Sequence, residues 1–288
     1  MKKFYKICAL VLAVFFLAIG LNIYHDIHTT SQTMSHFNKP NQFSNQTKRK
    51  KIVFKKFTKI KLDTYLPDIQ VIPGKKYQVT IIGNYGADIS KIKTSIKDNQ
   101  LTIFDKPEPH YNNGNYHVEI RVPKSHSLLE ISGSCYACTL LLKNLIIPRI
   151  NIKVDDSDAI LKNTTVKKSN LILSDGEFKV SNSTLSSAKL ALSDSDCKIT
   201  DSQCKITATL NDGDALIKNS KITGNSSFNL SDGDFIMNKA PKISYDLTAD
   251  SEDTIKFDNT YHTSHLVKRL NGTPLLKVVS ADGDIAIN

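Results

Sequence analysis

The stretch LILSDGEFKV (Leu171–Val180) places a short acidic turn between two runs in which apolar and polar residues alternate. Related phrases follow it as LALSDSDCKI, LNDGDALI, LSDGDFIM and VVSADGDIAI. The intervals between the first acids of successive turns are 19, 19, 18, 20, 18 and 32, for the series Asp156, Asp175, Asp194, Asp212, Asp232, Asp250 and Asp282. A fixed period of this length is typical of a repeat architecture. We expect the last interval to hold one coil plus an insertion over residues 257–272.

Apolar residues keep fixed offsets from the turn and therefore define the fold. They recur three residues after the first acid (Ala159, Phe178, Cys197, Ala215, Phe235), five after it (Leu161, Val180, Ile199, Ile217, Met237), ten after it (Val166, Leu185, Cys204, Ile222), four before it (Leu171, Leu190, Ala208, Phe228) and two before it (Leu173, Leu192, Leu210, Leu230). One repeat cannot bury these side chains alone, but stacked repeats can. We therefore predict an all-β fold, a parallel β-helix-like solenoid of ~19-residue coils.

The acidic turns allow three interpretations. Carboxylates in equivalent positions of neighbouring coils lie about 4.8 Å apart and repel by about 3.5 kcal/mol at an effective dielectric of about 20. The architectural interpretation is that the first Asp caps the turn while Gly takes a left-handed conformation, with Ser157, Ser195 and Ser251 in place of Gly in three turns. Calcium between successive coils and a row of catalytic acids are the alternatives. We favour the architectural interpretation, because the motif lacks the GGxGxDx nonapeptide of calcium-binding β-rolls and no aromatic or Arg companions accompany the acids.

The rest of the chain divides by composition. Residues 1–6 read as a cytoplasmic tail, and the apolar run 7–23 as a transmembrane signal-anchor helix. A cleavable signal peptide is the alternative, because Ala18 and Gly20 form a small-x-small site. Residues 24–51 read as a disordered polar and basic stem. Residues 52–150 form the N-terminal β part of the solenoid domain, since short period-two runs alternate there with turn signals, and 151–288 form the repeat solenoid.

Positive charge is concentrated in the first half. Of the net charge of +10, residues 1–150 contribute +13 (22 Lys and Arg, 9 Asp and Glu) and residues 151–288 contribute −3 (16 and 19). The run KRKK, made of Lys48, Arg49, Lys50 and Lys51, favours contact with anionic lipid or an acidic wall polymer; a solvated stem is the alternative. Nucleic acid is not expected as a partner, since no aromatic-interleaved motif accompanies the charge.

Cysteine and histidine motifs do not indicate a metal or redox site. Cys135 and Cys138 have CxxC spacing, but they lie in a predicted strand, where residues three apart face opposite sides, so we expect buried thiols that do not meet. Cys197 and Cys204 occupy core offsets. His262 and His265 read as a solvated pair in a loop without a third ligand. We therefore assign no catalytic, cofactor-binding or metal residues, and no cofactor.

The order of these features resembles a bacterial family of putative adhesins, β-strand-repeat envelope proteins of unknown function. The segments that carry the resemblance are KIKLDTYLPDIQVIPGKKYQVTI, DNQLTIF, VEIRVPKSHSLLEI and the S-D-G-D turns ending in ADGDIAI. The resemblance implies a β-helix-like fold and a cell-surface setting.

Taken together, the sequence predicts a single-pass protein of the cell membrane with its C-terminal domain extracytoplasmic. We expect an adhesin-like binding or structural module that is not an enzyme and whose partner is an envelope protein or glycan. A polysaccharide-acting β-helix enzyme and a calcium-stiffened spacer are the alternatives.

Overall fold

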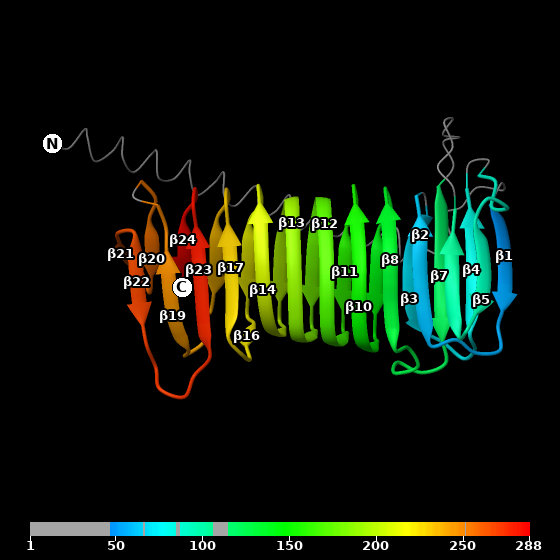
Figure 1. The fold of residues 1–288 in the computed structure, drawn as a ribbon, viewed down its shortest axis with the longest axis horizontal. Coiled ribbons are helices and arrows are strands. Elements are labelled where there is room, and N and C mark those ends of the chain that lie inside the picture. The colour runs from blue at the N-terminus through cyan, green and yellow to red at the C-terminus, as the bar shows by residue number, and fades with distance from the viewer. Residues whose placement is uncertain (1–46, 66, 85–86, 106–114, 251) are drawn as a thin grey trace, which may run out of the picture. The chain divides into compact units, whose positions relative to one another are not determined.

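The computed structural model describes residues 47–65, 67–84, 87–105, 115–250 and 252–288. Within these ranges every regular element is a β-strand, and no helix is present that is long and apolar enough to cross a membrane. Residues 47–288 form one compact unit, drawn in Figure 1. The predicted tail 1–6, the anchor 7–23 and the stem up to residue 46 lie outside the described residues.

The repeat array forms the solenoid that its period predicts. The strands of its body are β10 (Ile146–Asp155), β11 (Ala159–Lys162), β12 (Thr165–Ser181), β13 (Thr184–Thr200), β14 (Gln203–Asn211), β15 (Ala215–Lys218), β16 (Lys221–Ile222), β17 (Ser226–Leu230) and β18 (Phe235–Asn238). Equivalent strands of successive coils pair in parallel: Ile152 lies opposite Leu171, Leu171 opposite Leu190, and Leu190 opposite Ala208. The residue differences of 19, 19 and 18 are the sequence period, so the prediction of a parallel solenoid is confirmed for this part.

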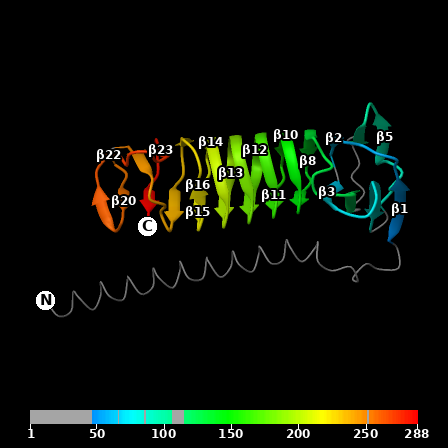
Figure 2. The same ribbon diagram turned by 90° about the horizontal axis from the view of Figure 1, so that it is seen from below.

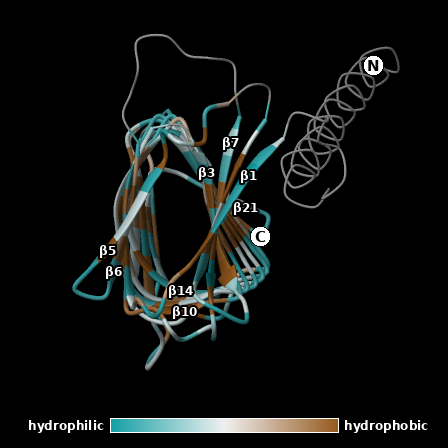
Figure 3. Ribbon diagram, turned by 90° about the vertical axis from the view of Figure 1, so that its right-hand side faces the viewer, coloured by the Kyte–Doolittle hydropathy of each residue, from teal (hydrophilic) through white to brown (hydrophobic). Residues whose placement is uncertain are grey.

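Each coil contributes to two broad sheet faces. The first face contains β10, the N-terminal halves of β12 and β13, β14 and β17; the second face contains β11, the C-terminal halves of β12 and β13, β15 and β18. Between the faces, apolar side chains fill the interior, and Figure 3 shows hydrophobic residues, in brown, along the strands of the stack. The residues at all five predicted apolar offsets are buried, and Phe228 and Phe235 pack across the interior with ring centroids 5.1 Å apart.

The coils at the N-terminal end are not stacked in chain order. The strands here are β2 (Lys59–Thr64), β3 (Pro67–Pro73), β6 (Gln100–Phe104), β7 (Tyr116–Val122), β8 (Glu130–Tyr136) and β9 (Leu140–Lys143). β2 pairs in parallel with both β6 and β8, and β3 with both β7 and β9. The first coil of the chain therefore lies between the second and the third, as the blue strands between green ones show in Figure 1.

The C-terminal end repeats this arrangement. Its strands are β19 (Ser244–Thr248), β20 (Ile255–Phe257), β23 (Leu275–Ser280) and β24 (Ile285–Ile287). β23 pairs in parallel with β17 and β19, and β24 with β18 and β20. The last coil is thus inserted between two earlier ones, seen as red strands between yellow and orange in Figure 1. Our expectation that residues 257–272 interrupt a sequential stack identified the insertion but missed this order.

Antiparallel strands close both ends. At one end β1 (Lys48–Val53) pairs with β4 (Gln78–Gly83), β4 with β7, and β5 (Lys93–Lys97) with β6. At the other, β21 (Thr260–His262) pairs with β20, and β22 (His265–Lys268) with β19. Figure 2 shows β1 and β22 at opposite ends of the stack. Short or lysine-bearing edge strands discourage further strand addition.

The predicted stem boundary at residue 51 is therefore wrong in its last part. Lys48, Arg49, Lys50 and Lys51 belong to β1, where the backbone pairs with β4 from Thr80 to Gly83. Composition suggested disorder because the four residues are charged, but Ile52 packs against the core and the ladder fixes the strand.

Candidate functional site

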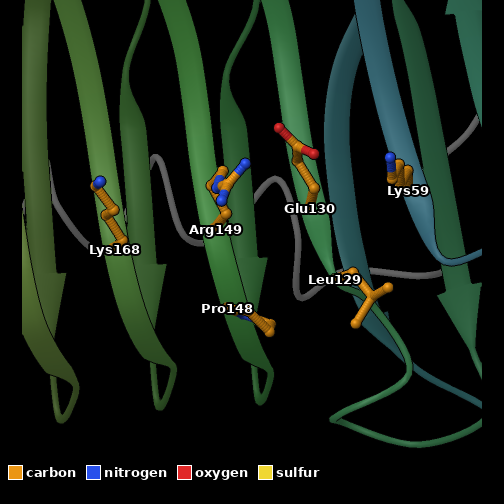
Figure 4. A pocket seen from close by; sticks show the side chains of 6 residues that line it. All are labelled: Lys59, Leu129, Glu130, Pro148, Arg149 and Lys168. Atoms are coloured by element: carbon orange, nitrogen blue, oxygen red, sulfur yellow. The ribbon is translucent and has the colours of Figure 1, made fainter.

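A groove lined by cations lies at the start of the first face. It encloses about 330 Å³ and is lined by Lys59, Leu129, Glu130, Pro148, Arg149 and Lys168. In Figure 4 these side chains project from neighbouring strands on one side of the sheet. The ladder explains this convergence, because Lys59 lies opposite Glu130, Glu130 opposite Arg149, and Arg149 opposite Lys168. Residues that are far apart in sequence thus become next neighbours.

The charge of the groove is not balanced from within the protein. Lys59, Arg149 and Lys168 are exposed, and Glu130 is partly exposed. Among the residues that the structure describes, no ion pair joins any of the three cations to a carboxylate. Three cations around one carboxylate leave two positive charges for a ligand. An Arg guanidinium presents a planar fork of donors that matches a carboxylate or phosphate, while Lys acts as a point charge.

At the acidic turns, which run along another corner, the first and second acids have different roles. Asp156, Asp175, Asp194 and Asp212 each have φ between 49 and 53°, a left-handed conformation that Asp tolerates better than most residues. It is the second acid that caps, and it caps the next coil. Asp158 Oδ1 accepts a hydrogen bond from the Glu177 N–H at 3.0 Å. In the same way the Oδ1 atoms of Asp196, Asp214 and Asp234 accept from the backbone N–H groups of Asp214, Asp234 and Asp284, respectively.

The predicted capping role of the first acid is thus wrong, although architecture is the right class. The predicted positive φ of Gly is found at Gly233 and Gly283, with values of 128° and 133°, but not at Gly176 and Gly213. At two of the turns, close approach to the preceding coil requires Gly. A Cβ at Gly176 would lie 2.0 Å from the Ser157 carbonyl oxygen, and one at Gly213 would lie 2.2 Å from that of Ser195. Ser195 Oγ accepts from the Gly176 N–H at 3.2 Å. Ser and Gly alternate in these four coils, and a side chain at either Gly would meet the backbone carbonyl of the preceding coil. Ser251 lies outside the described residues.

Substitutions within one turn distinguish the structural roles of the first and the second acid. We expect Asp158→Ala to lower the free energy of unfolding by about 1–2 kcal/mol, because the Glu177 N–H loses a charged acceptor. Asp156→Asn keeps the left-handed preference and removes only a charge, so we expect a change within about 0.5 kcal/mol. Urea denaturation followed by circular dichroism measures both, and equal destabilisation by the two variants would contradict these roles.

In the described part of the chain, no group of three or more His, Cys, Asp or Glu side chains is arranged to hold a metal ion. The acids of the turns instead repel one another. The pKa of Asp232 is raised above its usual value, first by the carboxylate of Asp282, then by desolvation and by Asp212. Such repulsion is tolerated because these side chains face solvent.

Comparison with known proteins identifies the fold. Residues 57–288 match the family Toastrack DUF4097. The chain belongs to this family. The match confirms the resemblance to a putative-adhesin family of unknown function that the sequence predicts. No curated protein matches the chain in sequence.

Three solved structures are similar to this Toastrack chain, and the first of them supports the same architecture. A putative adhesin from Bacteroides fragilis is 14% identical, with a TM-score of 0.53, over 85% of this chain and 98% of that one. A putative adhesin from Parabacteroides merdae is 11% identical, with a TM-score of 0.47, over 85% and 98%. A putative lipid binding protein from Parabacteroides distasonis is 13% identical, with a TM-score of 0.47, over the same shares.

The CxxC cysteines of the Toastrack domain differ from our prediction. Cys135 and Cys138 are both buried and free, as expected, but their thiols meet. The pKa of Cys138 is raised, first by a hydrogen bond with the Cys135 thiol and then by burial. The period-two rule fails here because Ala137 has φ of 49°, which turns the chain and returns Cys138 to the interior. Cys197 and Cys204 are buried core residues, as predicted, and burial raises the pKa of Cys204 to about 12.

The two histidines of the HTSH sequence lie on edge strands rather than in a loop. His262 ends β21 and His265 begins β22. His265 Nε2 lies 3.3 Å from Asp246 Oδ1, and Arg269 pairs with the other oxygen of that carboxylate at 3.1 Å. The carboxylate is thus engaged by two partners on the C-terminal insertion, an arrangement that fixes the insertion on β19.

The basic strand β1 presents cations on both sides of an edge. Lys50 lies opposite Ile81, whose side chain faces the core, whereas Arg49 and Lys51 lie opposite Ile82 and Thr80 on the other side. All four cations of the run are exposed. Lysines on an edge strand are also a common protection against aggregation, so the charge of β1 alone does not decide its function.

Proposed function

We propose that this protein is an adhesin-like binding module of the bacterial cell envelope, anchored through residues 7–23, which holds an anionic group of its ligand in the groove of Lys59, Arg149 and Lys168. The observation that carries the proposal is the groove itself: three exposed cations, fixed in ladder register, lack a carboxylate partner in the described part of the protein. A binding role is also supported by the similar solved structure from Bacteroides fragilis, which is named a putative adhesin.

The groove is suited to binding rather than turnover. Its single carboxylate, Glu130, lies between Lys59 and Arg149 in the ladder without an ion pair to either, and ionised carboxylates accept hydrogen bonds from ligand hydroxyl groups. A glycosidase needs a pair of carboxyl groups that flank the bond to be broken. The second acid is missing from the six lining residues. We therefore propose a non-enzymatic module, without a cofactor, and treat glycan hydrolysis as the competing function.

The basic strand β1 fits the same setting. In the chain it follows the predicted stem, so its cations lie at the end of the folded unit from which the chain leads back to the anchor. Each Lys or Arg near an anionic membrane contributes about 1 kcal/mol of attraction. We propose that Lys48, Arg49, Lys50 and Lys51 rest against anionic lipid or wall polymer, while the groove remains open to a ligand, an envelope protein or glycan.

The groove is tested with a short acidic glycan. We expect residues 47–288 to bind digalacturonate, and the double variant Arg149→Ala/Lys168→Gln to bind it at least ten-fold more weakly, as judged by isothermal titration calorimetry at low salt. The matched control is Lys198→Gln/Lys218→Gln, which removes two cations from the second face. An unchanged affinity of the groove variant would overturn the proposal, and release of shortened glycan would establish the enzyme instead.

A further inference from the structure

The cation groove is the beginning of a longer positively charged surface on the first face. Two rows of outward-facing residues run across the strands β2, β8, β10, β12, β13 and β14. The first row is Lys59, Glu130, Arg149, Lys168, Ser187 and Lys205; the second row, two residues further along each strand, is Lys61, Ser132, Asn151, Asn170, Lys189 and Thr207. Neighbouring strands lie about 4.8 Å apart, so five steps span about 24 Å along the solenoid axis.

We propose that these two rows form a track for a linear acidic glycan, which lies along the solenoid axis with one end in the groove. This inference rests on the proposed function and extends it from one anionic group to a polymer. The strand spacing supports a linear ligand, because it repeats the same outward positions at regular steps along a flat face.

The charge of the track favours a polyanion. The two rows contain six cations, Lys59, Lys61, Arg149, Lys168, Lys189 and Lys205, and one acid, Glu130. No ion pair joins any of the six to a carboxylate in the described part of the chain. The cations are distributed along the whole length, since Lys189 and Lys205 lie on β13 and β14, beyond the groove.

The second face does not offer an equivalent track. Its lysines alternate with an acidic row formed by the second acids of the turns, Asp158, Glu177, Asp196, Asp214 and Asp234. Lys179 illustrates the difference, because it pairs with both Asp158 and Glu177. The first face is therefore the one on which a polyanion meets little repulsion.

The uncharged positions of the track indicate a hydroxyl-bearing polymer. Asn170 Nδ2 donates to Asn151 Oδ1 at 2.9 Å, so the amides form a ladder whose remaining donors and acceptors face solvent. Ser132, Ser187 and Thr207 add hydroxyl groups. Neither row contains an aromatic residue, and stacking on aromatic side chains is the usual way to hold single-stranded nucleic acid. Sugar hydroxyl groups match the track better than bases do.

The far end of the track is marked by Lys205 on β14. Lys205 lies beside Gly224 of the next coil: a Cβ at Gly224 would lie 2.9 Å from Lys205 Cδ. The lysine stem therefore packs against a residue without a side chain. This places a cation at the end of the track opposite to the groove.

The test compares glycan lengths. With galacturonate oligomers of two, four and eight units, we expect the affinity of the unaltered residues 47–288 to rise at least ten-fold from the shortest to the longest. The variant Lys189→Gln/Lys205→Gln should bind the dimer normally but lose most of the gain with length, whereas Lys198→Gln/Lys218→Gln on the second face should retain it. Thermal melts confirm that each variant is folded.

The outcomes separate this inference from the proposed function. Dimer binding that depends on Arg149 and Lys168 without a gain for longer oligomers would leave the groove intact and overturn the track. A gain that survives Lys189→Gln/Lys205→Gln would overturn it as well. Inorganic polyphosphate of matched charge serves as a comparison: if it binds as tightly as the octamer, and Asn170→Ala weakens neither, the glycan part of the proposal is wrong.

Discussion

The substitution Val278→Asp is expected to unfold the C-terminal end of the solenoid, whereas Val279→Asp, one residue later, is expected to leave it folded. Val278 is 0% exposed and lies in the ladder between Phe228 and Leu247. Val279 points away from the core and is partly exposed. A carboxylate at position 278 would be buried without a partner, which costs at least about 3 kcal/mol. The neighbouring substitution introduces the same charge into solvent.

The non-sequential coil order makes the damage extend beyond the substituted strand. In a solenoid stacked in chain order, loss of the last coil would remove only that coil, because each repeat contacts its neighbours. Here β23 and β24 connect the body to β19 and β20, which have their other partners in the edge strands β22 and β21. Loss of the inserted coil therefore releases four further strands.

Hydrogen exchange measures this coupling directly. In Val278→Asp we expect amides of β19 and β20 to lose protection together with those of β23, while β10 and β12 keep theirs. Protection of β19 and β20 that persists while β23 exchanges would contradict the inserted-coil arrangement. Val279→Asp, measured in the same way, controls for the added charge.

Much of the fold follows from the sequence because the period constrains it residue by residue. Once the acidic turns are aligned, the alternation between buried and exposed positions assigns the inward residues, and Leu171, Leu173, Phe178 and Val180 are all buried. The pattern is reliable here because the side-chain period of a strand is two, and a shift of the register by one residue would expose the whole apolar set.

The order of the end coils does not follow from the sequence. Coils that share one pattern of buried positions can stack on one another in any order, so the pattern does not determine which are neighbours. The insertion of residues 257–272 was visible, but its consequence was not: it gives the chain enough length to form the outermost coil first and then return. The turn at Ala137 was hidden for a related reason, since Ala is not a residue that ordinarily marks a left-handed conformation.

The cation groove shows both the strength and the limit of sequence reasoning. Arg149, Lys168 and Lys205 all lie seven residues before the first acid of their turn, so an alignment of coils by outward positions would have revealed part of the row. Lys59 and Glu130 belong to coils without an S-D-G-D turn, and their place in the row depends on the pairing of β2 with β8. That pairing joins residues 71 positions apart in the chain, which no local pattern reports.

A second large effect is expected at the N-terminal inserted coil, from Gly133→Ala. Gly133 lies opposite Leu62 in the β2–β8 ladder, and a Cβ there would lie 1.9 Å from the Leu62 carbonyl oxygen. Its φ of 112° is a conformation that residues with a side chain rarely adopt. Relief of the clash requires β2 and β8 to separate. We expect a loss of at least about 3 kcal/mol of unfolding free energy, from backbone strain and overpacking together.

Gly272→Ala separates these two contributions. Gly272 also has a positive φ, 71°, but a Cβ there would meet nothing within 4 Å. We therefore expect about 1 kcal/mol of destabilisation from backbone strain alone. Urea denaturation of both variants gives the difference, and comparable losses would mean that strain, rather than the close approach of β2 to β8, accounts for the glycine at position 133. A larger loss for Gly133→Ala would instead locate the cost where the first coil of the chain is inserted against β8, as the close contact requires.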